Sequence, residues 1–560
     1  MDPSSPWGYE AKHVALHGAR QYDEAIDAFN SMLQVIEQSH DPAVKQLRNN
    51  YVSPSETIAA IDFIVDDILK KCPLVVINVT TGYLYDKTER KHSFKVDPRF
   101  KKLVSSMTTK VDKGQIRPEV ESFFGYVMFS HVWNYPEGPG KEPLFKDVNA
   151  VKSVWNLSDE PLNNKLRNFC EETRRLGCSW AWSDTCCIDK TNTFILNQSL
   201  KSMYSWYANS AATLVFLADI AHPSKRGDLT RGRWMTRAWT LQELLSPKII
   251  LFYDSEWKRY LGNNVPNHKD SPEIKQELAV AIGIPQKTII AFSPENLGVR
   301  EKLCLASTRN ATVEEDIAYS LIGIFQSDII PQYGEGADAL GHLLEGIVDR
   351  TREVTVLAWS GKSSSYYSCL PASISVYEQT LSNLPSLDGE ELETRIGELD
   401  VKLPRERTLE IYNRIKGRPK FTNRRLELPC VVFPVESLEM PCEGEDSYCA
   451  KVSGIGKVAF TAADDLSVDN PQKYVFVHPW IRQLRGPSSG VAWRHSSDID
   501  NYRRALKMIA RLGQQFNGWL LVRVEEYEEH KRVATDCEIV LPGLGTDIPK
   551  DMQGKVLIIQ

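Results

Sequence analysis

The side chains most able to take part in catalysis or binding follow two apolar runs that are typical of buried strands. His131 ends the first run and could act as a base, although a single histidine at a strand end is more often a hydrogen-bonded structural residue. Asp184 and Asp189 follow the second run. They could contact a ribose hydroxyl or a metal ion, but capping of the next turn is the favoured interpretation. Cys186 has no histidine or aspartate partner in the nearby sequence, so packing is favoured over nucleophilic chemistry.

Trp239 and Glu243 stand four residues apart in a stretch that is predicted to be helical. This spacing puts both side chains on one helix face, so Trp239 could form a pocket wall beside the carboxylate. Two structural roles compete with any chemistry. Thr240 and Glu243 fit a capping box at a helix start, whereas in a helix that begins earlier Glu243 could pair with Arg237 or Arg233. From the residues alone, the structural roles are favoured.

Helices and short apolar strands alternate in the part of the chain that carries these residues. The pattern predicts an α/β fold with a parallel sheet. We expect strands at 74–79, 124–131, 179–184, 212–217 and 247–253, and helices at 163–175, 198–208 and 236–245.

The preceding segment, from about residue 10 to 71, is predicted to be helical, with Ser53 or Ser55 capping its second helix. The string 18–29 resembles the second half of a tetratricopeptide (TPR) repeat. One copy is visible, and a repeat array needs about three to be stable, so a helical cap is the favoured interpretation.

The chain turns helical again over 296–352, and the loop Ser360–Tyr367 marks a plausible boundary. Beyond it the pattern predicts an α+β region. Its expected strands are 426–432, 474–477, 519–524 and 556–559, with a helix near 498–511. The stretch 405–425 is rich in arginine and lysine. A solvated face is favoured there over a site for an anionic partner.

Composition narrows the class of protein. The 560 residues suggest three or four domains, and 67 basic against 73 acidic side chains give a net charge of −6, which argues against a dedicated nucleic-acid binder. No run approaches the roughly 20 apolar residues that span a bilayer, and no signal peptide is recognised. The 11 cysteines are scattered without C-x-x-C pairs, which predicts reduced thiols, no metal site and a cytoplasmic protein.

Three ordered blocks resemble the HET domain family, the heterokaryon-incompatibility module of fungal proteins. They are Tyr126–Trp133, Trp182–Lys190 with the following Ser202–Tyr207, and Arg233–Leu245. The resemblance continues through 315–325 and 333–336, and so covers roughly 73–371. Asn134 and Ser183 depart from the usual glycine and branched apolar residue. The resemblance implies fungal self/non-self recognition and programmed cell death, with protein partners or self-association.

Parts of the same blocks are remotely similar to Toll/interleukin-1 receptor (TIR) domains. The similarity implies a TIR- or flavodoxin-like core whose ligands bind beyond the carboxyl ends of the strands. In enzymatic TIR domains the glutamate of W-x-x-x-E cleaves the nicotinamide–ribose bond of NAD. This implies an alternative function, an NAD glycohydrolase with NAD as substrate, in which Glu243 is the catalytic carboxylate. The substrate-binding residues would be Ser130, His131, Trp133, Asp184, Arg237 and Trp239.

We therefore expect three parts in the chain. A helical, TPR-like segment covers 1–71. The HET domain covers 72–360, with its α/β core at about 120–260 and a helical extension at about 296–352. A C-terminal α+β domain covers 361–560.

Overall fold

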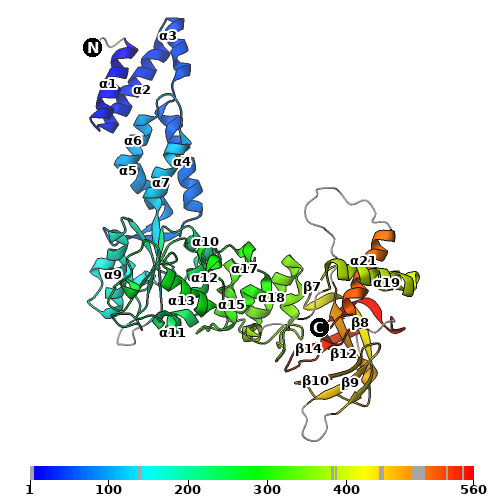
Figure 1. Ribbon diagram of the computed structural model, residues 1–560. Coiled ribbons are helices and arrows are strands. Elements are labelled where there is room, and N and C mark those ends of the chain that lie inside the picture. Colours follow the sequence, from blue (N-terminus) through cyan, green and yellow to red (C-terminus); the bar gives the residue numbers. More distant parts are fainter. Residues whose placement is uncertain are drawn as a thin grey trace. The chain divides into compact units, whose positions relative to one another are not determined.

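A computed structural model describes residues 5–134, 141–379, 382, 384, 387–440, 447–480, 498–524, 528–544 and 548–560. The chain divides into two compact units, Met1–Ser293 and Pro294–Gln560 (Figure 1). Both units combine helices with a sheet, so the predicted mixture of α and β structure is confirmed.

The sheet of the first unit carries the candidate site residues that the sequence pointed to. Its described strands follow the order β2-β1-β4-β3-β5-β6. Their bounds are β1 Val75–Asn78, β2 Leu84–Asp86, β3 Tyr126–His131, β4 Trp180–Trp182, β5 Ala212–Phe216 and β6 Ile250–Tyr253. Strands β4, β3, β5 and β6 are parallel, as predicted. The sheet is mixed, however, because β1 runs antiparallel to both β2 and β4. A short hairpin to β2, rather than a crossover helix, follows β1.

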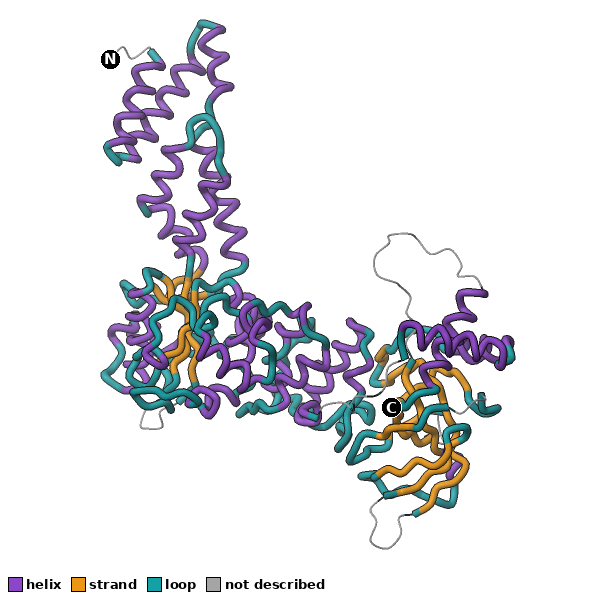
Figure 2. The backbone as a smooth tube through the Cα atoms, in the orientation of Figure 1, coloured by secondary structure: helices purple, strands orange, loops and turns teal. Residues whose placement is uncertain are grey.

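Helices surround the parallel strands and supply the crossovers between them (Figure 2). Between β3 and β4 lie α8 Phe145–Val151, the 3-10 turn η2 Val154–Asn156 and α9 Pro161–Arg175; α10 Thr193–Ala208 links β4 to β5. The stretch predicted as one helix over 236–245 is divided. It forms the end of the 3-10 turn η3 Arg233–Thr236 and the short helix α12 Thr240–Leu245. The unit also contains α11 Asp228–Arg231, η4 Tyr260–Gly262, α13 Pro272–Ile282 and α14 Gln286–Ile290.

The N-terminal part of the first unit is helical, as predicted. It contains α1 Pro6–Gly18, α2 Tyr22–Gln38, α3 Pro42–Gln46, η1 Leu47–Asn50 and α4 Pro54–Lys70. Ser53 caps α4 in a capping box with Glu56, which decides between the two serines that the sequence offered. The helices α5 Lys87–Val96, α6 Pro98–Ser106 and α7 Lys113–Phe124 were not predicted. Figure 1 shows α4, α5, α6 and α7 grouped together beside the sheet.

The second unit begins with helices. They are η5 Pro294–Asn296, α15 Val299–Ser307, α16 Asp316–Tyr319, α17 Ile322–Phe325, α18 Asp338–Thr351, η6 Val354–Leu357 and η7 Ile374–Glu378. The helices α19 Gly389–Lys402, α20 Arg405–Arg414 and α21 Asp498–Leu512 share an apolar core with the sheet that follows. In the basic stretch, Arg407 and Arg414 both pair with Glu410 on α20, which fits the predicted solvated face.

The sheet of the second unit is predominantly antiparallel and has the described order β10-β9-β8-β11-β12-β13-β15. The long strand β8 also pairs with β15. The strands β8, β11, β12, β13 and β15 therefore close into a ring. The bounds are β7 Lys420–Thr422, β8 Arg425–Glu439, β9 Tyr448–Val452, β10 Gly456–Phe460, η8 Pro471–Lys473, β11 Tyr474–Pro479, β12 Phe516–Val524, β13 Glu529–Arg532, β14 Ile539–Leu541 and β15 Gln553–Ile559. Every strand that the sequence predicted in this region is found within these bounds.

Among the described residues, no helix combines the length and the apolar character that crossing a membrane requires.

Candidate functional site

Ser130, Trp234 and Glu243 are joined by hydrogen bonds at the carboxyl end of β3. The Ser130 hydroxyl donates to the Glu243 carboxylate, and the Trp234 indole Nε1 donates to the Ser130 oxygen over 2.7 Å. All three side chains are buried, Glu243 with 8% of its surface exposed. Burial and the nearby Glu243 raise the pKa of Tyr207 well above its ordinary value. The Glu243 carboxylate thus lies in a buried, hydrogen-bonded group.

The predicted capping box at Thr240 and Glu243 is wrong. Helix α12 begins at Thr240, with Trp239 at the N-cap position and no side-chain cap. The Thr240 hydroxyl instead donates to the carbonyl oxygens of Trp234 and Arg237, over 2.7 and 2.9 Å. Trp239 is half-buried against the core of the unit.

Trp133, Asp184 and Lys190 form a second group at the same edge of the sheet. The Trp133 indole donates to an Asp184 oxygen over 2.8 Å, and the Lys190 ammonium lies 3.4 Å from the centre of a Trp133 ring. Burial raises the pKa of Asp184, while the positive charge of Lys190 acts in the opposite direction. Trp133 is 36% exposed, so this group reaches the surface. In this group the Trp133 side chain contacts an acidic side chain through its indole N–H and a basic side chain through its ring.

His131 lies in a third group, beside a buried ion pair. The Lys165 ammonium contacts the Glu142 carboxylate, and the His131 ring nitrogen Nε2 is 3.6 Å from the same carboxylate. Burial pushes both partners toward their neutral forms, raising the pKa of Glu142 and lowering that of Lys165. Burial also lowers the pKa of His131 well below its ordinary value, and the Lys165, Lys190 and Arg237 cations add to that effect. His131 is thus neutral near pH 7. Neither of its ring nitrogens has a hydrogen-bond partner among the described residues.

Two further interpretations from the sequence concern the loop after β4. Asp189 accepts hydrogen bonds from the backbone and the hydroxyl of Thr191, over 3.0 and 2.6 Å, so it caps the turn as expected. Asp184 does not cap the turn in this way and instead accepts from Trp133. Cys186 is fully buried, and its neighbour Cys187 together with burial raises the pKa of its thiol, as expected for packing rather than nucleophilic chemistry.

The loop that follows β5 lies beyond the carboxyl end of a parallel strand, where the TIR- or flavodoxin-like resemblance places ligands. It forms a hollow of about 420 Å³ whose lining includes Asp219, His222, Lys225 and Arg231. The His222 ring nitrogen Nδ1 lies 2.8 Å from the buried Asp254 carboxylate, which directly follows β6. Ser130, Glu243 and Trp239 are not among the residues that line this hollow.

Among the described residues, no three histidine, cysteine, aspartate or glutamate side chains are grouped as metal ligands would be.

Reasoning from the sequence missed Glu142 and Lys165, and it named Trp234 without finding its hydrogen bond to Ser130. A signal existed for Lys165, because it lies beside Leu162, Leu166 and Phe169 on the buried stripe of α9. A lysine on such a stripe indicates a buried partner. Glu142 and Trp234 lie far from their partners in the sequence, so no local pattern could have found them.

The comparisons with known proteins bear on the sheet that carries these groups. Residues 126–227 match the family described as "Heterokaryon incompatibility protein (HET)". The chain contains a HET domain. The match covers β3, β4 and β5 with Ser130, His131, Trp133 and Asp184. It ends before Trp234, Arg237, Trp239 and Glu243.

A relative of this HET-domain chain is the vegetative incompatibility protein HET-E-1 of Podospora anserina. The two are 33% identical over 250 residues, which are 42% of this chain and 17% of the relative. The chain thus aligns with about a sixth of the relative's length. No solved structure matches the chain. Neither comparison supports the TIR likeness or NAD cleavage.

Proposed function

We propose that this HET-domain protein acts in vegetative incompatibility, as an interaction and assembly module of fungal self/non-self recognition. The observation that carries the proposal is the HET match over 126–227, together with the 33% identity to a protein named for vegetative incompatibility. We also propose that this action leads to programmed cell death and that the protein is located in the cytoplasm. The partner is another protein or a second copy of this chain.

The fold that we propose for the HET core is the TIR- or flavodoxin-like doubly wound sheet. Numbered by their sequence order, the four parallel strands follow the spatial order 2-1-3-4. The flavodoxin-like sheet begins with the same order, 2-1-3-4-5. Helices α9 and α10 supply crossovers between consecutive parallel strands, which is the connection that such folds use.

For the domains, we propose the three parts that the sequence suggested: a helical, TPR-like segment over 1–71, the HET domain over 72–360 and a C-terminal domain over 361–560. The helices α1, α2 and α4 support the first part. The HET match over 126–227 supports the second, whose helical extension at about 296–352 belongs to the second compact unit.

The surface that we propose for signalling lies around Trp133. This ring is partly exposed. Asp184 holds its indole N–H and Lys190 lies over the ring, so it offers a preformed apolar contact with two adjacent charges. Aromatic side chains of this kind often dominate the binding energy of protein interfaces. For Glu243 and its partner Ser130 we propose a structural role, because both are buried and bonded to each other.

The function is tested by expressing the full chain at high level in a filamentous fungus. We expect the wild type to kill hyphal compartments, measured by uptake of a vital dye. We expect Trp133→Ala to reduce killing at least about tenfold at equal protein level, since truncating a central aromatic side chain costs 2 kcal/mol or more. Trp7→Ala is the matched control, because Trp7 is 58% exposed and lies outside the HET match. Killing by Trp133→Ala at the wild-type rate would refute the role of this surface.

The same proteins test the enzymatic alternative. Purified wild type at high concentration should release no nicotinamide from NAD, because the Glu243 carboxylate is occupied by Ser130. Suppose instead that the wild type cleaves NAD, that folded Glu243→Gln does not, and that Glu256→Gln still does. Glu243 would then have a catalytic role rather than a structural one. Glu256 is an exposed glutamate of the same unit and serves as the control.

A further inference from the structure

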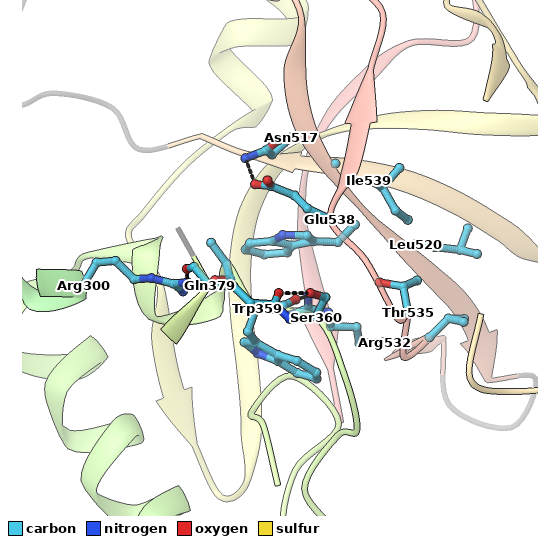
Figure 3. Close-up of a pocket in the computed structure, with 14 residues that line it drawn as sticks. Arg300, Trp359, Ser360, Gln379, Asn517, Leu520, Arg532, Thr535, Glu538 and Ile539 are labelled. Carbon is cyan, nitrogen blue, oxygen red and sulfur yellow. Dashed lines mark hydrogen bonds between the residues drawn. The ribbon is translucent and has the colours of Figure 1, made fainter. Parts of the chain in front are cut away.

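A small cavity in the second unit is lined by charged and aromatic side chains. Its volume is about 60 Å³, and it lies among β12, β13, β14, the start of α15 and the segment after η6. The lining includes Arg300, Trp359, Trp519, Arg532 and Glu538. Figure 3 shows Arg300 extending toward the other lining residues from a helix.

Within the part of the chain that the structure describes, Arg532 is a buried cation without a carboxylate partner. It is 4% exposed, and its guanidinium lies 4.0 Å and 5.1 Å from the ring centres of Trp359 and Trp519. It donates to the carbonyl oxygens of Leu357 and Trp359 over 2.7 and 2.6 Å. No carboxylate of the described residues forms an ion pair with it. Burial lowers its pKa to about 10, which still leaves it charged at pH 7. Buried charges are normally paired, so this one calls for a counter-charge.

Arg300 repeats the arrangement at the edge of the same cavity. Its guanidinium donates to the carbonyl oxygens of Ala358 and Gln379. Within the described residues it too has no carboxylate in ion-pair contact. The one acid in the lining, Glu538, accepts from the Asn517 amide and from the Ser382 backbone over 2.9 Å. Two guanidinium groups and one carboxylate leave one net positive charge around the cavity.

Asn517 lines the cavity and has one polar atom without a partner in the described part of the chain. Its amide nitrogen donates to Glu538, which fixes the orientation of the amide (Figure 3). Its buried oxygen Oδ1 then has no partner among the described atoms. Buried polar atoms are nearly always hydrogen-bonded, so water or a ligand must supply the missing donor.

We propose that this cavity binds a small free carboxylate whose charge compensates Arg300 and Arg532. A volume of about 60 Å³ offers roughly four to six water-sized positions, which suits a molecule of the size of formate, acetate or glycolate and excludes a nucleotide. A carboxylate is planar and accepts hydrogen bonds from guanidinium groups, and Trp359 and Trp519 line the same space.

The test uses the full chain and sodium acetate that replaces sodium chloride at constant ionic strength. We expect acetate to raise the thermal unfolding midpoint in a saturable way, because a ligand that binds the folded state stabilises it, and calorimetric titration to give the same Kd. Arg300→Gln should weaken acetate binding by roughly tenfold or more, since it removes a charged hydrogen-bonding group. Arg523→Gln is the control, because Arg523 is exposed on β12 and does not line the cavity.

A second variant guards against misfolding of the first. Thr535→Leu fills part of the cavity without changing its charge, and it should also abolish the response to acetate. Equal unfolding midpoints in acetate and chloride would show that the cavity holds water only. Retention of the acetate response by folded Arg300→Gln or folded Thr535→Leu would place acetate elsewhere and overturn the proposal.

Discussion

At the scale of single residues, burial decides what the polar groups of the HET core can do. Ser130 and Glu243 were singled out from the sequence by resemblance, and the structure joins them across 113 positions. Their bond to each other could not be read from either local pattern. Trp234 completes the group through its indole nitrogen. A side chain of this size is usually buried in a core, but its hydrogen bond depends on where η3 packs.

His131 gives a prediction about pH. Its pKa in the folded protein lies well below the ordinary value of 6.5 because of burial and the Lys165, Lys190 and Arg237 cations. Between the two pKa values, His131 therefore binds a proton in the unfolded chain but not in the folded one. Its contribution to stability is complete above pH 6.5. It is lost as the pH falls from 6.5 toward the lower folded pKa.

We expect His131→Phe to reduce this loss. The wild type should lose up to about 1.4 kcal/mol more than the variant for each pH unit below 6.5, measured by urea unfolding between pH 7.5 and pH 5. Glu142 also faces His131, but its own titration is present in both proteins. His92→Phe, at an exposed position of α5, should follow the wild type. Parallel stability curves for wild type and His131→Phe would contradict the prediction.

At the scale of elements, the sequence predicted those whose apolar pattern is local. The strands β3, β4, β5 and β6 are short and wholly buried, so they stand out as apolar runs. Helix α5 was missed for the opposite reason. It buries Arg90 and Phe94 and otherwise presents polar side chains, so it lacks the apolar stripe by which a helix is recognised.

Arg90 attaches this missed helix to the sheet. It is fully buried, donates to the carbonyl oxygen of Phe124 over 2.9 Å, and lies 5.2 Å from the ring centre of Trp180 on β4. We expect Arg90→Lys to lower the free energy of unfolding by roughly 2–3 kcal/mol, because lysine keeps the buried charge but lacks the planar group that reaches both partners.

Urea unfolding followed by circular dichroism measures this effect. The matched control is Arg174→Lys at an exposed position near the end of α9, which should change stability by less than about 0.5 kcal/mol. If both variants unfold at the same urea concentration, the Arg90 contacts do not hold α5 to the sheet.

At the scale of the whole molecule, the two compact units have separate sheets. Each unit also has an apolar cluster of its own, in the first around the parallel strands and in the second around the closed sheet with α19, α20 and α21. The sequence placed a plausible boundary at 360–367, where a loop of small polar residues follows helices. The division between the units at residue 293 lies among short helices, where composition does not change.

We expect the fragments 1–293 and 294–560 to fold independently. Each should unfold cooperatively on heating, and the full chain should show two calorimetric transitions, because each unit has its own core. A fragment of residues 1–209 is the control. It lacks β5 and β6, and should show no cooperative transition. A single transition in the full chain, with both fragments unfolded, would contradict the division.

The pairing of β8 with β15 has a consequence for the order of folding. Seven residues of β15 pair with residues 426–432 of β8. This edge of β8 can therefore pair only with a strand that lies more than a hundred positions later in the sequence. Closing so long a loop costs entropy before the contact is made, which slows folding. During synthesis the first unit can complete its core early, while the edge of β8 that pairs with β15, at residues 426–432, stays unpaired until β15 leaves the ribosome. In the cell, chaperone demand should therefore concentrate on the second unit.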